Sequence, residues 1–385
     1  MNYRGDMRRN ITYVCMQTLE QGQAAHAHVF EIIKGLKKRG WKVDLIQSSP
    51  GHNTSTSSSK TISKLAVVKK IIDSIMQQAV YFPKNSPDIY YVRFHFLTIV
   101  ILMRAKIMKI PIIFEINGPF EDVFIAWPLA KKFRKFLIYI MEYQLKQSTY
   151  IIAVTPQLAI WASSIAHHQR VSVIPNGANT DIFRRTIETN YSDKYAVFFG
   201  TLASWQGIDT IIAATRLPAW PDDTKMVIIG DGELSSKVSD AAKDSNRLVY
   251  LNRQKYETLP DLISGAILSI SVQNNTGDRA KTGLSPLKVY ESLACATPII
   301  VSDFPGMADF VRELDCGIVI EPDNANALAE AVKIMAENPE LTNQMGARGL
   351  HGVLASHSWD ARASRTEEVI VDVLKNSSKI LAGSI

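Results

Sequence analysis

The sequence predicts an α/β protein made of two doubly wound domains, each a parallel sheet with helices on both faces. Its 385 residues exceed the roughly 100–200 that one domain usually contains. The hydrophobic content of 46% and the charged content of 21% are those of an ordinary globular protein. Short β-branched runs alternate with helical patterns along the chain, and this alternation is typical of parallel sheets covered by helices.

Both halves of the chain contain apolar, β-branched runs of strand length. Strands are expected at 11–15, 42–47, 89–93, 111–116, 150–154 and 171–174 in the first half, and at 195–200, 225–229, 248–251, 267–272, 298–301 and 317–320 in the second. Helical patterns separate most of them, and the stretch 28–39 places Val29, Ile32 and Leu36 on one face. Ligands of doubly wound sheets bind at the carboxyl ends of the strands, which predicts a site in the cleft between the domains.

The boundary between the domains is expected near residues 176–187, where turn-forming residues precede the next strand. The predicted organisation has three parts. An N-terminal Rossmann-like domain covers residues 1–180, and a C-terminal Rossmann-like domain covers 181–357. A C-terminal helix over 358–385 returns toward the first domain.

Cysteine usage and hydropathy exclude several protein classes. The longest apolar run without a charge, 94–103, has ten residues, whereas a spanning helix needs about 20. The first ten residues carry no apolar secretory core. Cys15, Cys295 and Cys316 show neither CxxC nor zinc-site spacing. We therefore expect a cytoplasmic protein.

Charge is distributed unevenly between the two halves. Residues 1–180 contain 23 Lys and Arg against 10 Asp and Glu, a net charge of +13, and residues 181–385 contain 20 against 27, a net charge of −7. A basic half attracts anionic membrane or phosphate. Two basic amphipathic stretches, 63–80 and 130–146, predict peripheral contact with the inner face of the cytoplasmic membrane. The alternative is that their apolar faces pack on the sheet. The sequence contains no recognisable nucleic-acid-binding module, so nucleic acid is not an expected partner.

Several segments carry a family resemblance by their order and spacing. They are the Gly-bearing loop EQGQ at 20–23, the junction VIPNGANTDIF at 173–183, the loop FFGTLASWQGID at 198–209 and the segment SPLKVYESLACATP at 285–298. Together they resemble the retaining glycosyltransferase family 4, and most closely a branch with a Trp-bearing loop and an SPLK motif. The resemblance covers about residues 11–360.

The resemblance implies a GT-B fold and transfer of a sugar from a nucleotide-sugar, with UDP and GDP not distinguished. It further implies retention without metal and a glycan or lipid-linked acceptor held by the first domain, in cell-surface polysaccharide or glycolipid biosynthesis. Four positions depart from the family pattern: Thr201 and Gln206 stand where the family has Arg and Lys, Gly283 replaces the first Glu of Glu-x₇-Glu, and Asn117 replaces a His. These departures leave open a second reading, a non-catalytic glycosyltransferase-like subunit. A sugar-nucleotide epimerase on the same fold is a weaker alternative.

Glycosyl transfer leaves negative charge on a diphosphate, so the donor site must supply N–H groups and cations. The turn 283–286 precedes an apolar helix over 287–296 with Pro at its start. Leu284, Ser285 and Leu287 are therefore candidates to present N–H groups or to pack near phosphate. Lys288 is expected to restore the missing positive charge, with Arg279 and Lys281 as further candidates. The alternative for these cations is a solvated basic loop.

The remaining candidates complete the predicted site. By resemblance, Glu291 binds the ribose hydroxyls, and the other expected donor-binding residues are Gly22, Gly200, Thr201, Gln206, Gly207 and Arg253. Glu115 is a candidate base or hydroxyl acceptor, and Asn117 is a candidate orienting group. Strand-end hydrogen bonding is the equal alternative for both. Gln23 and His26 are placed on the acceptor side, although either His26 or the nearby His28 is expected to cap or pack. No Asp-x-Asp motif stands at a strand end, so no metal is expected.

Overall fold

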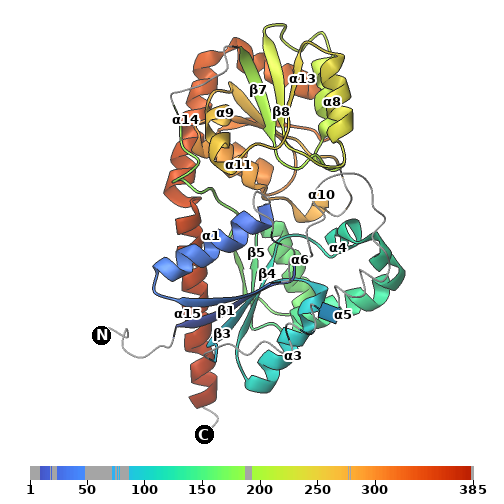
Figure 1. Cartoon of the computed structure of the whole chain (residues 1–385). Helices are drawn as coiled ribbons and strands as arrows, with labels where there is room; N and C mark the ends of the chain where they lie inside the picture. Colours follow the sequence, from blue (N-terminus) through green and yellow to red (C-terminus); the bar gives the residue numbers. More distant parts are fainter. Residues whose placement is uncertain are drawn as a thin grey trace. The chain divides into compact units, whose positions relative to one another are not determined.

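The computed structural model describes residues 9–17, 19, 24–47, 86–186, 193–275, 277 and 279–382, together with residues 72, 73, 76 and 78. These residues fall into two compact units. The first unit holds the described residues up to Ile174 and those from Ala363 on, and the second unit runs from Pro175 to Arg362. Each unit contains one six-stranded parallel sheet (Figure 1). The predicted architecture of two parallel-sheet α/β domains is confirmed.

The sheet of the first unit has the strand order β2-β1-β3-β4-β5-β6. Its strands are β1 (Asn10–Cys15), β2 (Lys42–Gln47), β3 (Ile89–Arg93), β4 (Ile112–Ile116), β5 (Tyr150–Ala153) and β6 (Val171–Val173). Its helices are α1 (Ala24–Lys38), η1 (Phe96–Thr98), α3 (Ile99–Met108), α4 (Glu121–Ala126), η2 (Pro128–Phe133), α5 (Arg134–Lys146), α6 (Pro156–Ala166) and most of α15 (Trp359–Ala382). The strand order reverses between β1 and β3, and such switch points mark ligand sites in open parallel sheets.

The sheet of the second unit has the order β12-β11-β10-β7-β8-β9, so its switch point lies between β7 and β10. Its strands are β7 (Lys194–Phe199), β8 (Thr224–Ile229), β9 (Leu248–Leu251), β10 (Leu268–Ser271), β11 (Ile299–Ser302) and β12 (Gly317–Ile320). Its helices are α7 (Ile208–Thr215), α8 (Ser235–Lys243), η3 (Tyr256–Thr258), α9 (Leu259–Ser264), α10 (Arg279–Thr282), α11 (Leu287–Ala294), α12 (Met307–Leu314), α13 (Ala325–Glu337) and α14 (Pro339–Ser356).

Both faces of the second sheet are buried. Ala196 and Phe198 of β7 belong to the core on one face, whereas Tyr195 and Val197 belong to the core on the other. Strands that are covered on both faces have continuous apolar sequences, and they can therefore be predicted from the sequence. All twelve predicted strands form, and no predicted end differs from the observed one by more than one residue.

The predicted helices agree less closely with the structure. The helix expected to begin at residue 28 begins four residues earlier, at Ala24. The stretch 130–146 is not a single helix, because the backbone at Phe133 leaves helical geometry (φ −112°, ψ 21°) between η2 and α5. The other basic stretch, 63–80, lies outside the described residues except for positions 72, 73, 76 and 78.

The division between the units falls at Ile174, just before the expected boundary region of 176–187 and six residues before the predicted end of the first domain at 180. Ala178 explains the difference, because it forms a parallel bridge with Ser358. Its N–H donates to the carbonyl oxygen of His357 over 3.0 Å, and its own carbonyl accepts from the N–H of Trp359 over 3.0 Å. The IPNG segment is thereby tied to the end of the second unit.

Helix α15 packs closely on α1 within the first unit. The indole N–H of Trp41, which follows α1, donates to Glu367 Oε1 over 2.8 Å. A Cβ atom at Gly35 would lie 2.3 Å from the Cβ of Ala363, so only glycine allows this approach. No helix within the described ranges has both the length and the apolar character that crossing a bilayer requires.

Candidate active site

In the second unit, candidate residues gather at the switch point between β7 and β10. Strand β7 leads directly into Gly200, whose φ of 131° is open to glycine but rarely to other residues. A Cβ atom there would lie 3.4 Å from Lys288 Nζ. The chain then continues through the exposed Thr201 to Gly207 (φ 64°), which caps the N-terminus of α7. The structure therefore brings the first loop of this unit against the side chain of Lys288.

Lys288 is a buried cation on the second residue of α11. Its side chain is 8% exposed, and its Nζ donates to Gln206 Oε1 over 2.9 Å. The same nitrogen lies 3.8 Å from the centre of the Phe198 ring, within the range of a cation–π contact. Burial lowers the pKa of Lys288 to about 7, although the nearby Glu291 acts in the opposite direction. Lys288 is thus close to losing its proton at neutral pH.

Glu291 follows Lys288 by three residues and lies on the same side of α11. It is 6% exposed and accepts a hydrogen bond from the Tyr256 hydroxyl over 3.2 Å. Burial raises the pKa of Glu291 to about 7, against the opposing effects of Tyr256 and Lys288. A buried carboxyl with so high a pKa is poorly solvated, and hydrogen-bond donors from a ligand would stabilise its ionised form.

The turn before α11 is built by internal hydrogen bonds. Ser285 Oγ accepts from the N–H of Asn176 over 3.0 Å and lies 2.9 Å from the Tyr290 hydroxyl, while the amide group of Asn176 donates to Ser285 O. Ser285 therefore joins this turn to the IPNG segment. Leu284 donates its N–H to the carbonyl of Pro305 and is not available through that group to a phosphate. The first helical residue, Leu287, is buried.

Gly283 explains one departure from the family pattern in physical terms. Its φ of 76° lies in the left-handed region. A Cβ atom at this position would meet the carbonyl oxygen of Pro305 at 2.5 Å. A glutamate could not occupy this position without moving the backbone, so the turn has a shape that excludes the family's first Glu.

The other predicted cations are Arg253, Lys281 and Arg279. Arg253 is exposed and its Nη1 lies 4.0 Å from a carboxylate oxygen of Asp231. Lys281 is exposed on α10, which Arg279 opens, and the Arg279 side chain lies outside the described part of the structure. The structure thus brings together Gly200, Gln206, Lys288 and the α11 face that carries Glu291.

In the first unit, a polar cluster lies at the carboxyl ends of β3 and β4. Its centre is Glu115, 2% exposed and paired in register with Arg93 of β3. Its carboxylate accepts from the Tyr91 hydroxyl (2.6 Å), Arg93 Nη1 (3.1 Å) and Asn117 Nδ2 (2.7 Å), and it lies 2.8 Å from His28 Nε2. Burial by itself would raise the pKa of Glu115, but His28, Arg93 and Tyr91 together hold it below its usual range.

This environment disfavours the predicted role of Glu115 as a base, because a carboxylate with four close donors holds a proton poorly. Its geometry fits the alternative of strand-end hydrogen bonding, through which it orients its neighbours. Asn117 and Arg93 are partly exposed, and Arg93 Nε also donates to Gln17 Oε1 over 3.0 Å. Tyr91, His28 and Glu115 itself are buried.

Sequence reasoning missed Arg93 as a site residue and placed His26, not His28, on the acceptor side. His28 reaches Glu115, whereas His26 packs against Phe30 with ring centres 4.4 Å apart. Burial lowers the pKa of His26. The available signal for Arg93 was a cation at the end of a buried strand. Gly22 and Gln23 lie outside the described residues.

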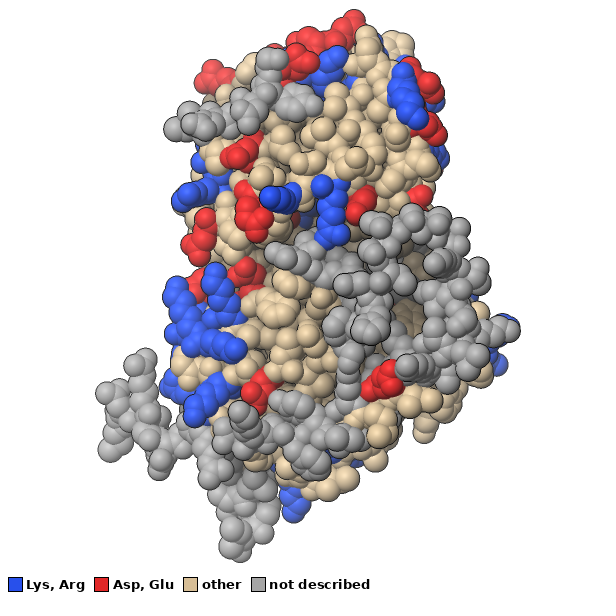
Figure 2. All heavy atoms as spheres, viewed as in Figure 1, with Lys and Arg blue, Asp and Glu red and all other residues tan. Residues whose placement is uncertain are grey.

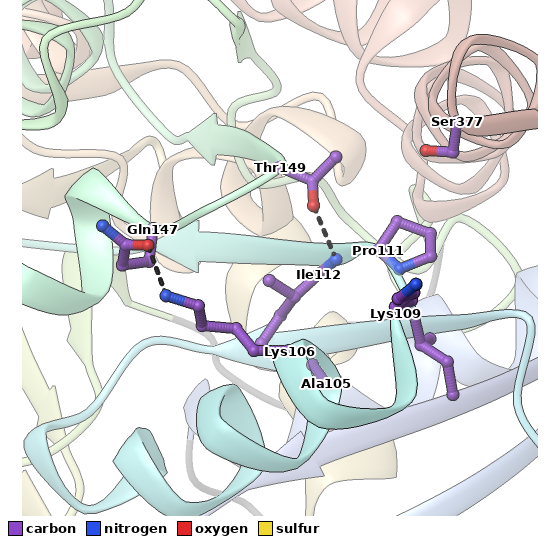
Figure 3. A pocket seen from close by; sticks show the side chains of 9 residues that line it. Ala105, Lys106, Lys109, Pro111, Ile112, Gln147, Thr149 and Ser377 are labelled. Carbon is purple, nitrogen blue, oxygen red and sulfur yellow. Dashed lines mark hydrogen bonds between the residues drawn. The ribbon is translucent and has the colours of Figure 1, made fainter. Parts of the chain in front are cut away.

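A pocket of about 250 Å³ lies elsewhere in the first unit, at the amino end of β4 (Figure 3). Lys106 and Gln147 meet at its wall, where Lys106 Nζ donates to Gln147 Oε1 over 2.7 Å. Because Glu115 and Asn117 lie at the carboxyl end of the same strand, the pocket is separate from the candidate site. Among the described residues, no group of three or more His, Cys, Asp or Glu side chains is placed to hold a metal ion.

Two family models match consecutive parts of the chain. The model described as Glycosyltransferase Family 4 matches residues 25–182, and the model described as Glycosyl transferases group 1 matches residues 179–351. The two matches follow one another along the chain and overlap at residues 179–182. An uncharacterized glycosyltransferase of Methanocaldococcus jannaschii is 26% identical over 252 residues, which is 60% of this chain. The match spans 62% of that relative, less than two thirds of its length.

Solved structures share the fold over nearly the whole chain. A sucrose-phosphate synthase from Thermosynechococcus elongatus matches with a TM-score of 0.78 at 16% identity, covering 96% of this chain and 100% of that one. HepE from Anabaena, solved in complex with UDP-glucose, matches with a TM-score of 0.64 at 14% identity, covering 97% and 99%. The two six-stranded units thus have the GT-B fold of these proteins.

Proposed function

We propose that this chain is a glycosyltransferase that moves a sugar from a nucleotide-sugar donor to a glycan or lipid-linked acceptor. One observation carries the proposal: Lys288 and Glu291 are both buried, at 8% and 6% exposure, on one side of α11 at the switch point of the second sheet. The two family models support it, as does the UDP-glucose bound to the Anabaena relative in fold.

In this proposal the diphosphate of the donor lies between Lys288 and the loop that begins at Gly200. A protonated Lys288 forms a charge-assisted hydrogen bond to phosphate. This contact strengthens as the glycosidic bond breaks, because negative charge then grows on the leaving phosphate. Lys288 therefore stands in for the cation that the family carries at position 206. Gln206, which accepts from Lys288 Nζ over 2.9 Å, holds the ammonium group in place.

Glu291 is assigned to the ribose of the nucleotide. A carboxylate has two oxygens and accepts from two neighbouring hydroxyls at once. Those donors favour the ionised form, which burial alone disfavours. The structure offers the carboxyl one described donor, the Tyr256 hydroxyl, and a bound ribose would add two more.

The first unit is assigned to the acceptor. Glu115 fixes Arg93 and Asn117 at the carboxyl end of its sheet, and these two partly exposed groups contact acceptor hydroxyls. The proposal includes retention of the anomeric configuration without a divalent metal, in line with the resemblance to family 4. NMR of the product linkage and an assay in EDTA test these points. An inverted product or complete loss of activity in EDTA would remove them.

The central test is donor binding. A panel of UDP- and GDP-sugars is first screened for a rise in Tm, because a ligand of the native state stabilises it. Calorimetry with the best donor then compares Lys288→Met and Glu291→Gln with Lys243→Met and Glu330→Gln, exposed controls on α8 and α13. Each site variant is expected to weaken binding by about 1–3 kcal/mol, the range for hydrogen bonds to charged groups. Wild-type affinity in both site variants would overturn the assignment.

A second candidate function is a non-catalytic subunit that binds nucleotide-sugar. The specific observation is that Thr201, Gln206 and Asn117 occupy positions that the family fills with Arg, Lys and His. Slow hydrolysis of the bound donor without acceptor separates the two functions. An enzyme releases nucleoside diphosphate at a rate that falls in Lys288→Met, whereas a binding subunit leaves the donor intact.

A further inference from the structure

Helices α4, η2 and α5 of the first unit carry a group of exposed apolar side chains. The group consists of Ile125, Leu129, Phe133, Phe136 and Tyr139, with 40%, 46%, 65%, 63% and 67% exposure. The three helices contact one another in sequence along one side of the unit (Figure 1). Single exposed apolar residues are ordinary, but five of them on three consecutive helices, three of which are aromatic, indicate an interaction surface. We call it the aromatic–basic surface.

The core of the first unit does not use these side chains. Helix α5 buries Met141 and Leu145 in the core, and its buried Gln144 accepts a hydrogen bond from the Thr98 hydroxyl over 2.8 Å. The apolar residues of this stretch thus divide between two faces. The expected packing on the sheet accounts for Met141 and Leu145, and it leaves Phe133 and Phe136 in solvent.

Four cations accompany the exposed rings. Lys131, Lys132, Arg134 and Lys135 are all exposed at the junction of η2 and α5. The helices also carry three acids: Glu121 is paired with Arg134 (2.7 Å), Glu142 is paired with Lys146 (4.0 Å), and Asp122 is the third. Lys131, Lys132 and Lys135 form no ion pair with any residue that the structure describes. The surface therefore combines apolar rings with three uncompensated positive charges.

We propose that the aromatic–basic surface docks on an anionic lipid bilayer. Aromatic side chains and long lysines are suited to the headgroup region, where the rings enter the boundary of the acyl chains and the ammonium groups meet lipid phosphates. No described helix could span the bilayer, so the contact is peripheral. The surface lies in the unit assigned to the acceptor and would bring that unit to a lipid-linked acceptor. This last point rests on the proposed function, whereas the docking itself does not.

A second basic group in the same unit provides a matched control. It consists of Lys34, Lys37 and Lys38 of α1, all exposed or partly exposed, and blue spheres gather over this helix in Figure 2. Neutralising three lysines in either group changes the net charge equally. A difference between the two triple variants therefore reports where the membrane binds and not how basic the protein is.

The experiment is co-sedimentation of the full chain with vesicles of phosphatidylcholine alone or mixed with phosphatidylglycerol, at low and high salt. Wild type is expected to bind the anionic vesicles at low salt and to dissociate at high salt. The variant Lys131→Gln/Lys132→Gln/Lys135→Gln is expected to bind on the order of 100-fold more weakly, since each basic residue contributes roughly fivefold. The α1 triple variant is expected to lose much less. Phe133→Ser/Phe136→Ser is expected to lose binding to the anionic vesicles at low salt, whereas Ile160→Ser, at an exposed position on α6, keeps it.

Three outcomes would overturn the proposal. Equal binding to neutral and anionic vesicles, or equal losses of vesicle binding in the two triple variants, would show that the aromatic–basic surface is not a specific site for anionic lipid. A concentration-dependent dimer that the Phe133→Ser/Phe136→Ser variant abolishes, without lipid binding by wild type, would assign the surface to a second copy of the chain. The rise in Tm with the nucleotide-sugar donor, measured in every variant, shows whether the donor site is intact. A failure of docking is thereby separated from a failure of the proposed function.

Discussion

Two buried glutamates at the carboxyl ends of two similar sheets have opposite electrostatics. Glu115 of the first unit and Glu291 of the second are 2% and 6% exposed. The environment lowers the pKa of Glu115 and raises that of Glu291 to about 7. The difference lies in the number of donors: Glu115 has four close polar neighbours, whereas Glu291 has the Tyr256 hydroxyl and the more distant Lys288. Burial alone therefore does not mark a binding group, and a deficit of partners is the more informative sign.

The largest expected effect concerns the satisfied cluster. Replacing Glu115 by Ala leaves Arg93, Tyr91 and His28 without their shared acceptor, and breaking a buried ion pair costs about 3–5 kcal/mol. We expect urea denaturation to show a loss of this size in the free energy of unfolding. Glu291→Gln is the comparison and is expected to cost little or to stabilise, because it removes a poorly solvated acid. Similar losses in the free energy of unfolding of the two variants would show that Glu115 and Glu291 do not differ in their contribution to stability.

The next effect tests whether charge, and not the particular residue, matters at the second site. Lys288→Met is expected to lose donor affinity. Because Lys288 Nζ and Gln206 Oε1 are 2.9 Å apart, adding Gln206→Lys to this variant places a new ammonium group close to the position of the lost one. Calorimetry is expected to show recovery of most of the roughly 1–3 kcal/mol lost. Lys288→Met combined with Gln344→Lys, which adds the charge on exposed α14, is expected to show none. Equal affinities in the two double variants would mean that position 206 has no access to the phosphate.

The pH dependence follows from the signs of the two shifts. Binding needs ionised Glu291 and protonated Lys288, each with a pKa of about 7 in the free protein. Donor affinity is therefore expected to peak near pH 7 and to fall by up to about tenfold per pH unit on either side. Glu291→Gln is expected to flatten the acidic limb and Lys288→Met the basic limb. A profile that both variants leave unchanged would assign the titration to other groups.

Stability is expected to respond to the same groups in a related way. The raised pKa of Glu291 gives a contribution to the free energy of unfolding that is present below the pKa of this residue in the unfolded chain. That contribution is lost as the pH rises to about 7, its pKa in the folded protein. The lowered pKa of Lys288 gives a contribution to stability that is present above the pKa of this lysine in the unfolded chain. That contribution is lost as the pH falls to about 7, its pKa in the folded protein. Glu115, with a lowered pKa, contributes at neutral pH and loses that contribution in acid.

The smallest expected effect concerns Asn117. Its amide donates to Glu115 over 2.7 Å but is one donor among several, and it is partly exposed. Asn117→Ala is expected to lower the free energy of unfolding by about 1 kcal/mol, the usual contribution of one hydrogen bond. Donor affinity is expected to stay at the wild-type value, because Asn117 belongs to the other unit. A loss of donor affinity would place this residue at the donor.

The strands and the α11 motif could be predicted from the sequence because their signals are local. Strands buried on both faces appear as apolar runs. Lys288 is predicted from its place at the start of an apolar helix and from the need for a cation, and Glu291 is predicted from the family resemblance of the motif that contains it. Arg93 and His28 could not be predicted in this way, because their roles depend on the register that sets β3 beside β4 and on the face of α1 turned to the sheet. His26 and His28 are two residues apart, which places them about 200° apart around a helix. The helical break at Phe133 is a similar case, since no local signal separates η2 from α5.

The contact between α1 and α15 has a consequence for the order of folding during synthesis. The second unit is continuous in sequence, from Pro175 to Arg362, whereas the first unit needs residues from Ala363 on to cover Gly35 and to bond Trp41. Domains generally fold as units as they leave the ribosome, N-terminal ones first. Here the part that is synthesised first is completed last. A released chain truncated after Arg362 is expected to show a protease-resistant second unit beside a first unit that is still cleaved. Equal resistance of the two units in such chains would show that α1 needs no late partner.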